Sequence, residues 1–204
     1  MNVIKRPDGH RSRRYIFRKQ VSLADMELIA RGSSWARVAD QPADAEHGIP
    51  LVVKWEIIPG LNVTYTEEDS IRSSYAMVTS RLGPEPADIA VAVFEVHPEV
   101  IPVDELISEL DSARGTADEA LALARAGLGA PLEPDQRLVQ RISSSLKSAD
   151  DRIREGALWA VSYSEWPTFR DAVRQLTETD PDTFIREFSA GVLDVFDRLG
   201  LENS

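Results

Sequence analysis

The chain has 204 residues, 43% of them hydrophobic, which is enough to bury the core of one large domain or of two small ones. It contains no cysteine, so a disulfide framework, a thiolate nucleophile and a zinc site with cysteine ligands are excluded. The longest purely apolar stretch, from Ile89 to Phe94, is far shorter than the roughly 20 residues that a membrane-spanning helix needs. We therefore expect a soluble, cytoplasmic protein that does not contact a membrane.

The net charge of −11 is unevenly distributed along the chain. The first nineteen residues carry seven basic side chains and one acid, Asp8, for a net charge of +6, so the remainder carries −17. We interpret residues 1–14 as a basic arm that is a solvated or partly disordered tail, or that folds back onto the acidic body. Such an arm could bind nucleic acid by neutralising phosphates, but the acidic body would repel the same polyanion.

The next part of the chain is predicted to begin with a strand and a short helix. Residues 15–21 have the composition of a strand. Ser22 is followed three positions later by Asp25, which is the pattern of a helix N-cap, and the helix is expected to end at Gly32. The stretch from that glycine to Gly48 has little periodicity and is predicted to be an irregular connection.

An antiparallel β-meander is expected next, because three runs rich in Val, Ile, Tyr and Thr are separated by turn residues. The runs cover residues 51–58, 61–66 and 71–79. In the middle run Leu61, Val63 and Tyr65 alternate with polar residues, as in a sheet with one wet face. The third run could instead begin a helix capped by Thr66. Residues 87–96 fit a buried strand or a short helix, and the flanking prolines favour the helix.

The character of the sequence changes after residue 102, where helical patterns follow one another with glycine and proline between them. The predicted helices cover residues 103–113, 116–126, 134–148, 150–162, 167–178 and 181–199. Helices joined by such short turns pack mainly on their sequence neighbours, as in a solenoid. The predicted fold class is therefore α+β, organised as a basic arm (1–14), an α+β region with a β-meander and one or two helices (15–101), and a helical repeat region (102–204).

A repeat of thirty-two residues marks the last part of this helical region. It is seen at four positions, which are Asp150, Ile153, Arg154 and Glu155 in one copy and Asp182, Ile185, Arg186 and Glu187 in the next. An aspartate in a turn, followed by an aliphatic-arginine pair and small residues, resembles HEAT-like repeats. The likeness covers these two copies and extends weakly to a third at Asp118, where Ala122 replaces the arginine.

The resemblance implies that the arginines pair with aspartates of neighbouring turns and form a ladder along the stack. Asp182 is the expected partner of Arg154, and Asp150 is expected to contact a preceding helix. In this role the arginines are structural. Direct contact of Arg154 or Arg186 with a ligand is the alternative.

Three large aromatic residues are expected at one corner between two helices. Trp159 and Tyr163 are four residues apart and share a helix face, and Trp166 begins the next helix. Such a cluster is commonly part of a core, but exposed beside arginines it forms a hot spot for protein binding. Some HEAT-like DNA-repair enzymes hold damaged bases in an aromatic and cationic pocket, a use that the negative charge of this chain opposes. The candidate partner surface comprises Arg154, Trp159, Tyr163, Trp166, Arg170 and Arg186.

The sequence has no familiar catalytic or metal-binding motif, and its three histidines lie in different segments without ligand spacing. The acidic cluster of Glu67, Glu68 and Asp69 is a candidate for acid and base catalysis, with Trp55 or Tyr65 lining the site. We predict no catalytic residue, no metal and no cofactor. The alternative is a small hydrolase-like enzyme with an acidic pocket between the β region and the helices.

The favoured function is that of a non-enzymatic protein-interaction module. A helical stack presents a surface to another protein. An acidic body favours a basic partner, because complementary potentials speed encounter and exclude wrong partners. Small bacterial inhibitor or immunity proteins act in this way on basic, nuclease-like targets, and an adaptor could do the same. The expected partner is therefore a basic protein.

Overall fold

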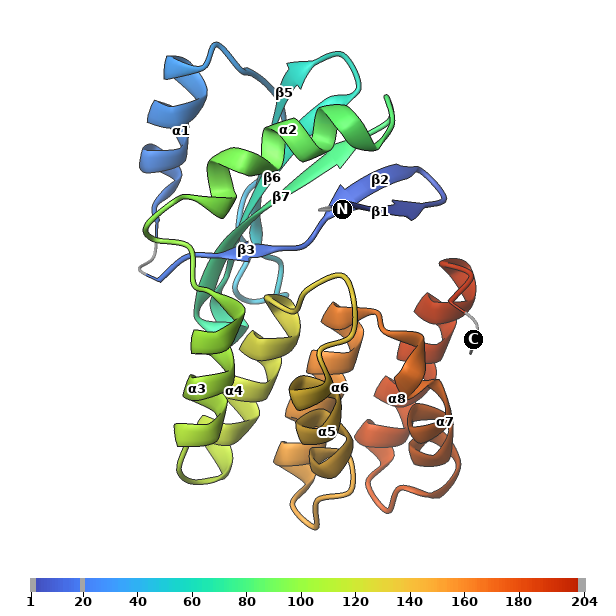
Figure 1. Cartoon of the computed structure of the whole chain (residues 1–204). Helices are drawn as coiled ribbons and strands as arrows, with labels where there is room; N and C mark the ends of the chain where they lie inside the picture. Colours follow the sequence, from blue (N-terminus) through green and yellow to red (C-terminus); the bar gives the residue numbers. More distant parts are fainter. Residues whose placement is uncertain (1–2, 19–20, 202–204) are drawn as a thin grey trace. The chain divides into compact units, whose positions relative to one another are not determined.

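The computed structural model describes residues 3–18 and 21–201, and the chain divides into two compact units, Met1–Ile101 and Pro102–Ser204 (Figure 1). The first unit contains an antiparallel sheet and the second a stack of helices. The predicted α+β fold class is confirmed. Among the described residues, no helix combines the length and the apolar character that crossing a membrane requires.

The first unit is built around one antiparallel sheet. Within the described residues its strands follow the order β1-β2-β7-β6-β5-β4, and β3 also pairs with β7. The elements are β1 (Val3–Arg6), β2 (Gly9–Ser12), β3 (Tyr15–Ile16), α1 (Leu23–Gly32), β4 (Ala36–Gln41), β5 (Leu51–Ile58), β6 (Leu61–Glu68), η1 (Asp69–Ile71), β7 (Ser73–Ser80) and α2 (Pro84–Glu95). Strands β5, β6 and β7 are the predicted meander, and α2 is the helix favoured over a strand. Helix α1 begins at the predicted capping box of Ser22 and Asp25.

Both helices of this unit pack against the same face of the sheet. Successive side chains of a strand point to opposite faces, so Val63 and Tyr65 of β6 lie on the same side as Trp55 of β5. These side chains form one buried cluster with Met26 of α1 and Phe94 of α2. The opposite face presents the alternate residues of the strands, which are mainly polar or charged.

The predicted basic arm is a β-hairpin in the described residues, so the expectation of a solvated tail is wrong for them. Strand β1 pairs with β2, which pairs in turn with β7, and Val3 is buried in the core. The turn contains Asp8 and Gly9, and the φ of Gly9 is 140°. A Cβ at Gly9 would lie 2.4 Å from the carbonyl oxygen of Ser80, so the close approach of the strands favours glycine. The sequence does not predict this hairpin, because the pairing of its backbone with β7, and not an apolar pattern, holds it in the sheet.

Two further elements differ from the prediction. Strand β3 is shorter than expected, because Phe17 forms only an isolated bridge with Val100. Residues 19 and 20 of the predicted strand lie outside the described residues. The segment predicted to be irregular contains the edge strand β4, all of whose residues are exposed. A strand without a buried face has no alternation of apolar residues, so its sequence carries no period for detection.

The second unit consists of helices in antiparallel pairs that follow one another along the chain (Figure 1). They are α3 (Val103–Ser112), α4 (Thr116–Leu128), α5 (Gln136–Ser145), α6 (Asp151–Ser164), η2 (Pro167–Phe169), α7 (Arg170–Thr179) and α8 (Thr183–Arg198). Each corresponds to a predicted helix. Helix α6 packs on both α4 and α8, so these three helices form one continuous layer.

Glycine and alanine let the axes of α4 and α6 approach closely. A Cβ built on Gly127 of α4 would lie 2.2 Å from Cα of Ala160, and one on Gly156 of α6 would lie 2.6 Å from Cα of Ala120. The two contacts follow the same chain direction on both helices, so α4 and α6 run parallel. The second helices of two consecutive pairs, α4 and α6, therefore stack side by side with the same polarity.

Candidate functional site

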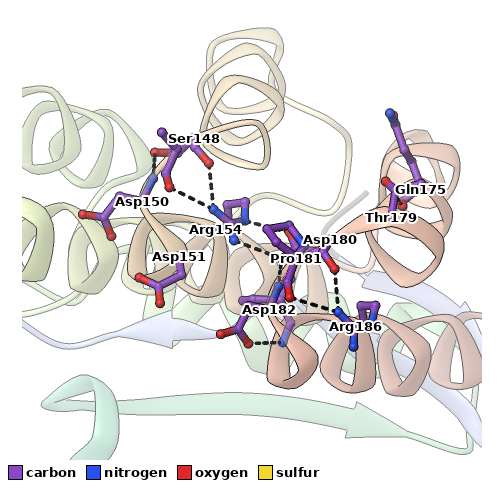
Figure 2. Close-up of polar contacts among 12 residues, drawn as sticks. Ser148, Asp150, Asp151, Arg154, Gln175, Thr179, Asp180, Pro181, Asp182 and Arg186 are labelled. Carbon is purple, nitrogen blue, oxygen red and sulfur yellow. Dashed lines mark hydrogen bonds and ion pairs between the residues drawn. The ribbon is translucent and has the colours of Figure 1, made fainter.

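The thirty-two-residue repeat corresponds to a repeated turn before α6 and before α8 (Figure 2). Asp150 and Asp182 are the N-caps of these helices, and each carboxylate accepts a backbone N–H of the first turn. The backbone N–H of Asp150 donates to Oγ of Ser148 at 3.2 Å, and that of Asp182 donates to Oδ1 of Asp180 at 2.9 Å. Ser148 and Asp180 are themselves thirty-two residues apart, so the repeat extends beyond the four positions seen in the sequence.

Arg154 and Arg186 make equivalent contacts with these turns. Nη1 of Arg154 donates to the carbonyl oxygens six and five residues earlier, at 2.9 and 3.3 Å. Nη1 of Arg186 donates to the carbonyl oxygens at the same two offsets, at 2.7 and 3.1 Å. Each arginine therefore closes the turn that precedes its own helix. This contact explains why the aspartate and the arginine have the same spacing in both copies of the repeat.

The two copies differ in the ion pair that links one turn to the next. Nε and Nη2 of Arg154 donate to both carboxylate oxygens of Asp180 at 2.8 and 2.9 Å, and the side chains are only 8% and 2% exposed (Figure 2). The prediction that Asp182 pairs with Arg154 is therefore wrong, because the carboxylate of Asp182 caps the N-terminus of α8. Arg186 has no equivalent buried carboxylate among the described residues and donates instead to Thr183 at 3.0 Å.

Asp150 contacts a preceding helix, α4, but its partner there is a threonine and not an arginine of the expected ladder. The hydroxyl of Thr116, at the start of α4, donates to its carboxylate at 2.8 Å. This hydrogen bond holds the pKa of the Asp150 carboxyl below its usual value. The contact joins the turn before α6 to the beginning of α4, so the capping aspartate also links consecutive helix pairs.

A cavity of about 510 Å³ lies beside the Arg154–Asp180 pair, between the two repeated turns. The guanidinium donates to four oxygen atoms of the chain, and Asp180 accepts from Arg154 and from the backbone of Asp182. Arg170 likewise contacts the carboxylate of Asp197 and the carbonyl oxygen of Leu201. Both arginines are thus committed to intrachain partners, which assigns them a structural role.

The predicted corner of three rings is only partly present. Trp159 and Tyr163 stack on α6 with ring centroids 5.6 Å apart. Trp166 does not join them, because it is buried against Phe169 and its indole N–H donates to the carbonyl oxygen of Pro131 at 3.1 Å. The chain leaves α6 through a residue in the left-handed conformation, which ends the helical face before Trp166.

Two phenylalanines of α8 extend the exposed part of this cluster. The ring of Phe188 lies 4.7 Å from Trp159, and Phe184 lies 6.0 Å from Phe188, measured between centroids. The four rings of Phe184, Phe188, Trp159 and Tyr163, hereafter the aromatic row, form an unbroken series across α6 and α8. Phe184 is 53% exposed and the other three are half-buried. The sequence shows the four-residue spacing of both phenylalanines, but only the packing of α8 on α6 brings the two pairs together.

Two glutamates lie next to the aromatic row on α6 and α8. Residues 102–204 contain 20 acidic and 11 basic side chains, for a net charge of −9. Glu155 precedes Trp159 by one turn of α6, and Glu187 lies between the two phenylalanines on α8. Within residues 3–18 and 21–201, neither glutamate forms an ion pair. The aromatic row is thus an apolar strip with unneutralised carboxylates beside it.

The acidic cluster of the first unit is divided, because Glu67 is hydrogen-bonded within the unit whereas Glu68 and Asp69 line a cavity. The carboxylate of Glu67 accepts from the Tyr65 hydroxyl at 2.8 Å and from the backbone N–H of Leu23 at 3.3 Å. Burial, together with Glu67, raises the pKa of Tyr65. Trp55 and Tyr65 are buried in the core of the unit and do not line the cavity beside Glu68 and Asp69. A cavity of about 290 Å³ lies beside Glu68 and Asp69.

Among the described residues, no group of three or more histidine, aspartate or glutamate side chains could hold a metal ion. Comparisons with protein-family models, with curated proteins and with solved structures gave no match. The HEAT-like character of the helical unit therefore remains a resemblance, based on the repeated turns at Asp150 and Asp182.

Proposed function

We propose that the chain is a protein-interaction module and that its helical unit binds a basic protein through the aromatic row. The observation that carries this proposal is the series of four rings in contact across two helices, one of them more than half exposed. Tryptophan and tyrosine are enriched at binding hot spots because a rigid ring contributes a large contact area at a small entropic cost. A surface of this kind fits an apolar or aliphatic side chain on the partner.

The charge of the helical unit supports a basic partner. Its net charge is −9, and Glu155 and Glu187 lie next to the rings without an ion pair in the described part of the chain. A partner with lysine or arginine around an apolar centre would complement this pattern, because its cations would pair with carboxylates at the rim. An inhibitor, immunity or adaptor protein that binds a basic, nuclease-like target would use such a surface.

The test combines capture of partners with two substitutions at exposed positions of α8. Phe184→Ala removes an exposed ring, and Glu187→Lys reverses a charge at its edge. A partner retained by the unmodified chain should bind Phe184→Ala at least about tenfold more weakly in calorimetry, since hot-spot truncations cost about 2 kcal/mol or more. Glu187→Lys should weaken the same partner through repulsion of its cations.

Matched controls separate this site from general effects of surface change. Ile89→Ala removes an apolar side chain that is 78% exposed on α2, in the other unit. Glu178→Lys makes the same charge reversal on α7, at an exposed glutamate without an ion pair among the described residues. The proposal fails if the controls weaken the captured partner as much as the test variants, or if retained proteins bind all four variants equally.

A further inference from the structure

We propose that the first unit binds the phosphate group of a small phosphorylated molecule in a cavity on the open face of its sheet. The cavity has a volume of about 200 Å³ and lies on the face opposite to α1 and α2. It is separate from the aromatic row, which belongs to the other unit. The proposal therefore assigns a second binding site of a different chemistry.

The pairing of the strands explains how this cavity is built. Lys54 of β5, Thr64 of β6 and Met77 of β7 are consecutive partners in one row across the sheet. Asn62 and Thr79 are partners in a second row. Side chains at alternate positions of neighbouring strands share a face, so the two rows form a common floor. This floor supplies one cation and several neutral groups that can donate hydrogen bonds to an anion.

Basic side chains form the walls of the cavity. Arg6 and Arg11 come from the β-hairpin, and Arg81 follows β7. With Lys54 they bring four basic side chains to a cavity with a single carboxylate, Asp8, among its lining residues. This concentration of positive charge is notable in a chain whose net charge is −11.

Two of these cations are available to a ligand. In the described part of the chain, neither Lys54 nor Arg81 forms an ion pair with a carboxylate. Arg6 and Arg11 already have partners in the protein. Arg6 donates to the carbonyl oxygen of Lys5, and Arg11 donates to that of Ser12. Arginine and lysine donate charge-assisted hydrogen bonds to phosphate oxygens, and the hydroxyl and amide groups of the floor complete the set.

The small volume of the cavity and the negative net charge of the protein favour a small phosphate ester over nucleic acid as the ligand. Sites for drug-sized ligands occupy about 300–1,000 Å³, so this cavity holds a phosphate group with little else. None of its lining residues is a tryptophan, tyrosine or phenylalanine, whereas proteins that bind single strands stack bases on such rings. The net charge of −11 also repels a long polyanion more strongly than a single phosphate.

Calorimetry of the full chain with inorganic phosphate and with pyrophosphate, at low ionic strength, tests this assignment. We expect both anions to bind, and Lys54→Gln and Arg81→Gln each to weaken binding at least about tenfold, because hydrogen bonds to charged groups contribute about 1.5–3 kcal/mol. Two separate variants keep the test valid if one of them disturbs the sheet. Thermal unfolding checks that each variant remains folded.

The controls distinguish a specific site from a general effect of charge. Arg31→Gln removes the same charge from α1 of the same unit and should leave phosphate affinity unchanged. Phe184→Ala should also leave it unchanged, which keeps this test independent of the protein-binding surface. Absence of binding, or an equal loss of affinity in Arg31→Gln, would overturn the proposal. Tighter binding of a single-stranded oligonucleotide, sensitive to Lys54→Gln and Arg81→Gln, would replace the small phosphate by nucleic acid.

Discussion

At the scale of single residues, the Arg154–Asp180 pair decides how one repeated turn is joined to the next. The guanidinium is buried, so its charge is tolerated only because a carboxylate and two carbonyl oxygens surround it. Arg186 closes its turn in the same way but is more exposed and has no buried carboxylate in the described residues. Arg154 and Arg186 therefore occupy the same position in the repeat but contribute differently to the free energy of unfolding.

Asp180→Asn should destabilise the chain by about 3–5 kcal/mol, because it leaves the charge of Arg154 buried without a counterion. Urea unfolding followed by circular dichroism measures the change in the free energy of unfolding. Glu178→Gln is the control two residues away, at an exposed position, and should change stability by less than about 0.5 kcal/mol. Equal stability of the two variants would show that the buried pair does not hold the turns together.

At the scale of elements, glycine allows the parallel helices α4 and α6 to approach closely. Gly127→Ala and Gly156→Ala both place a methyl group into the backbone of the facing helix, so the helices must separate. We expect each to lower the free energy of unfolding by about 1–3 kcal/mol or more. Gly191→Ala on α8 is the matched control, because nothing lies within 4 Å of its Cβ.

The control substitution should have the opposite sign. An alanine inside a helix loses less conformational freedom on folding than a glycine, so Gly191→Ala should stabilise the chain by about 0.5–1 kcal/mol. Denaturant unfolding of all three variants under one set of conditions provides the comparison. Stabilisation by Gly127→Ala or by Gly156→Ala would contradict the close packing of α4 on α6. Destabilisation by Gly191→Ala would instead contradict the open space beside that glycine of α8.

Elements with a strong local signal could be predicted from the sequence, and those that depend on pairing could not. Most helices after residue 102 begin at an aspartate or a proline, and α4 follows Gly115, so these local signals predict their approximate positions. Strand β4 lacks a buried face, and the hairpin of β1 and β2 is stabilised by the partner β7. Pairing with a distant strand leaves no period in the local sequence.

In the candidate site, too, contacts within one helix could be predicted from the sequence, whereas contacts between helices could not. The stacking of Trp159 and Tyr163 follows from their four-residue spacing, which the sequence displays. The contact of Trp159 with Phe188 depends on the packing of α8 against α6, which no local pattern contains. Trp166 was misplaced for a related reason, because the direction of the chain after α6 is set by one residue in the left-handed conformation.

At the scale of the whole molecule, charge and binding chemistry are divided between the two units. The first 101 residues have a net charge of −2, with 12 basic and 14 acidic side chains, whereas the remaining 103 have −9. The basic hairpin lines the proposed phosphate site, and the acidic helices carry the aromatic row. The overall net charge of −11 is thus the sum of a nearly neutral unit and an acidic unit, and the two proposed sites suit ligands of opposite charge.

This division predicts separate kinetic signatures for the proposed protein partner. Long-range attraction to the acidic unit should make the association rate fall as salt rises, whereas the aromatic row should control dissociation. We expect Phe184→Ala to raise the dissociation rate about tenfold or more with little change in the association rate. Surface plasmon resonance with the captured partner at several salt concentrations measures both rates. An association rate that is insensitive to salt would contradict steering by the acidic unit, and an unchanged dissociation rate in Phe184→Ala would remove the aromatic row from the interface.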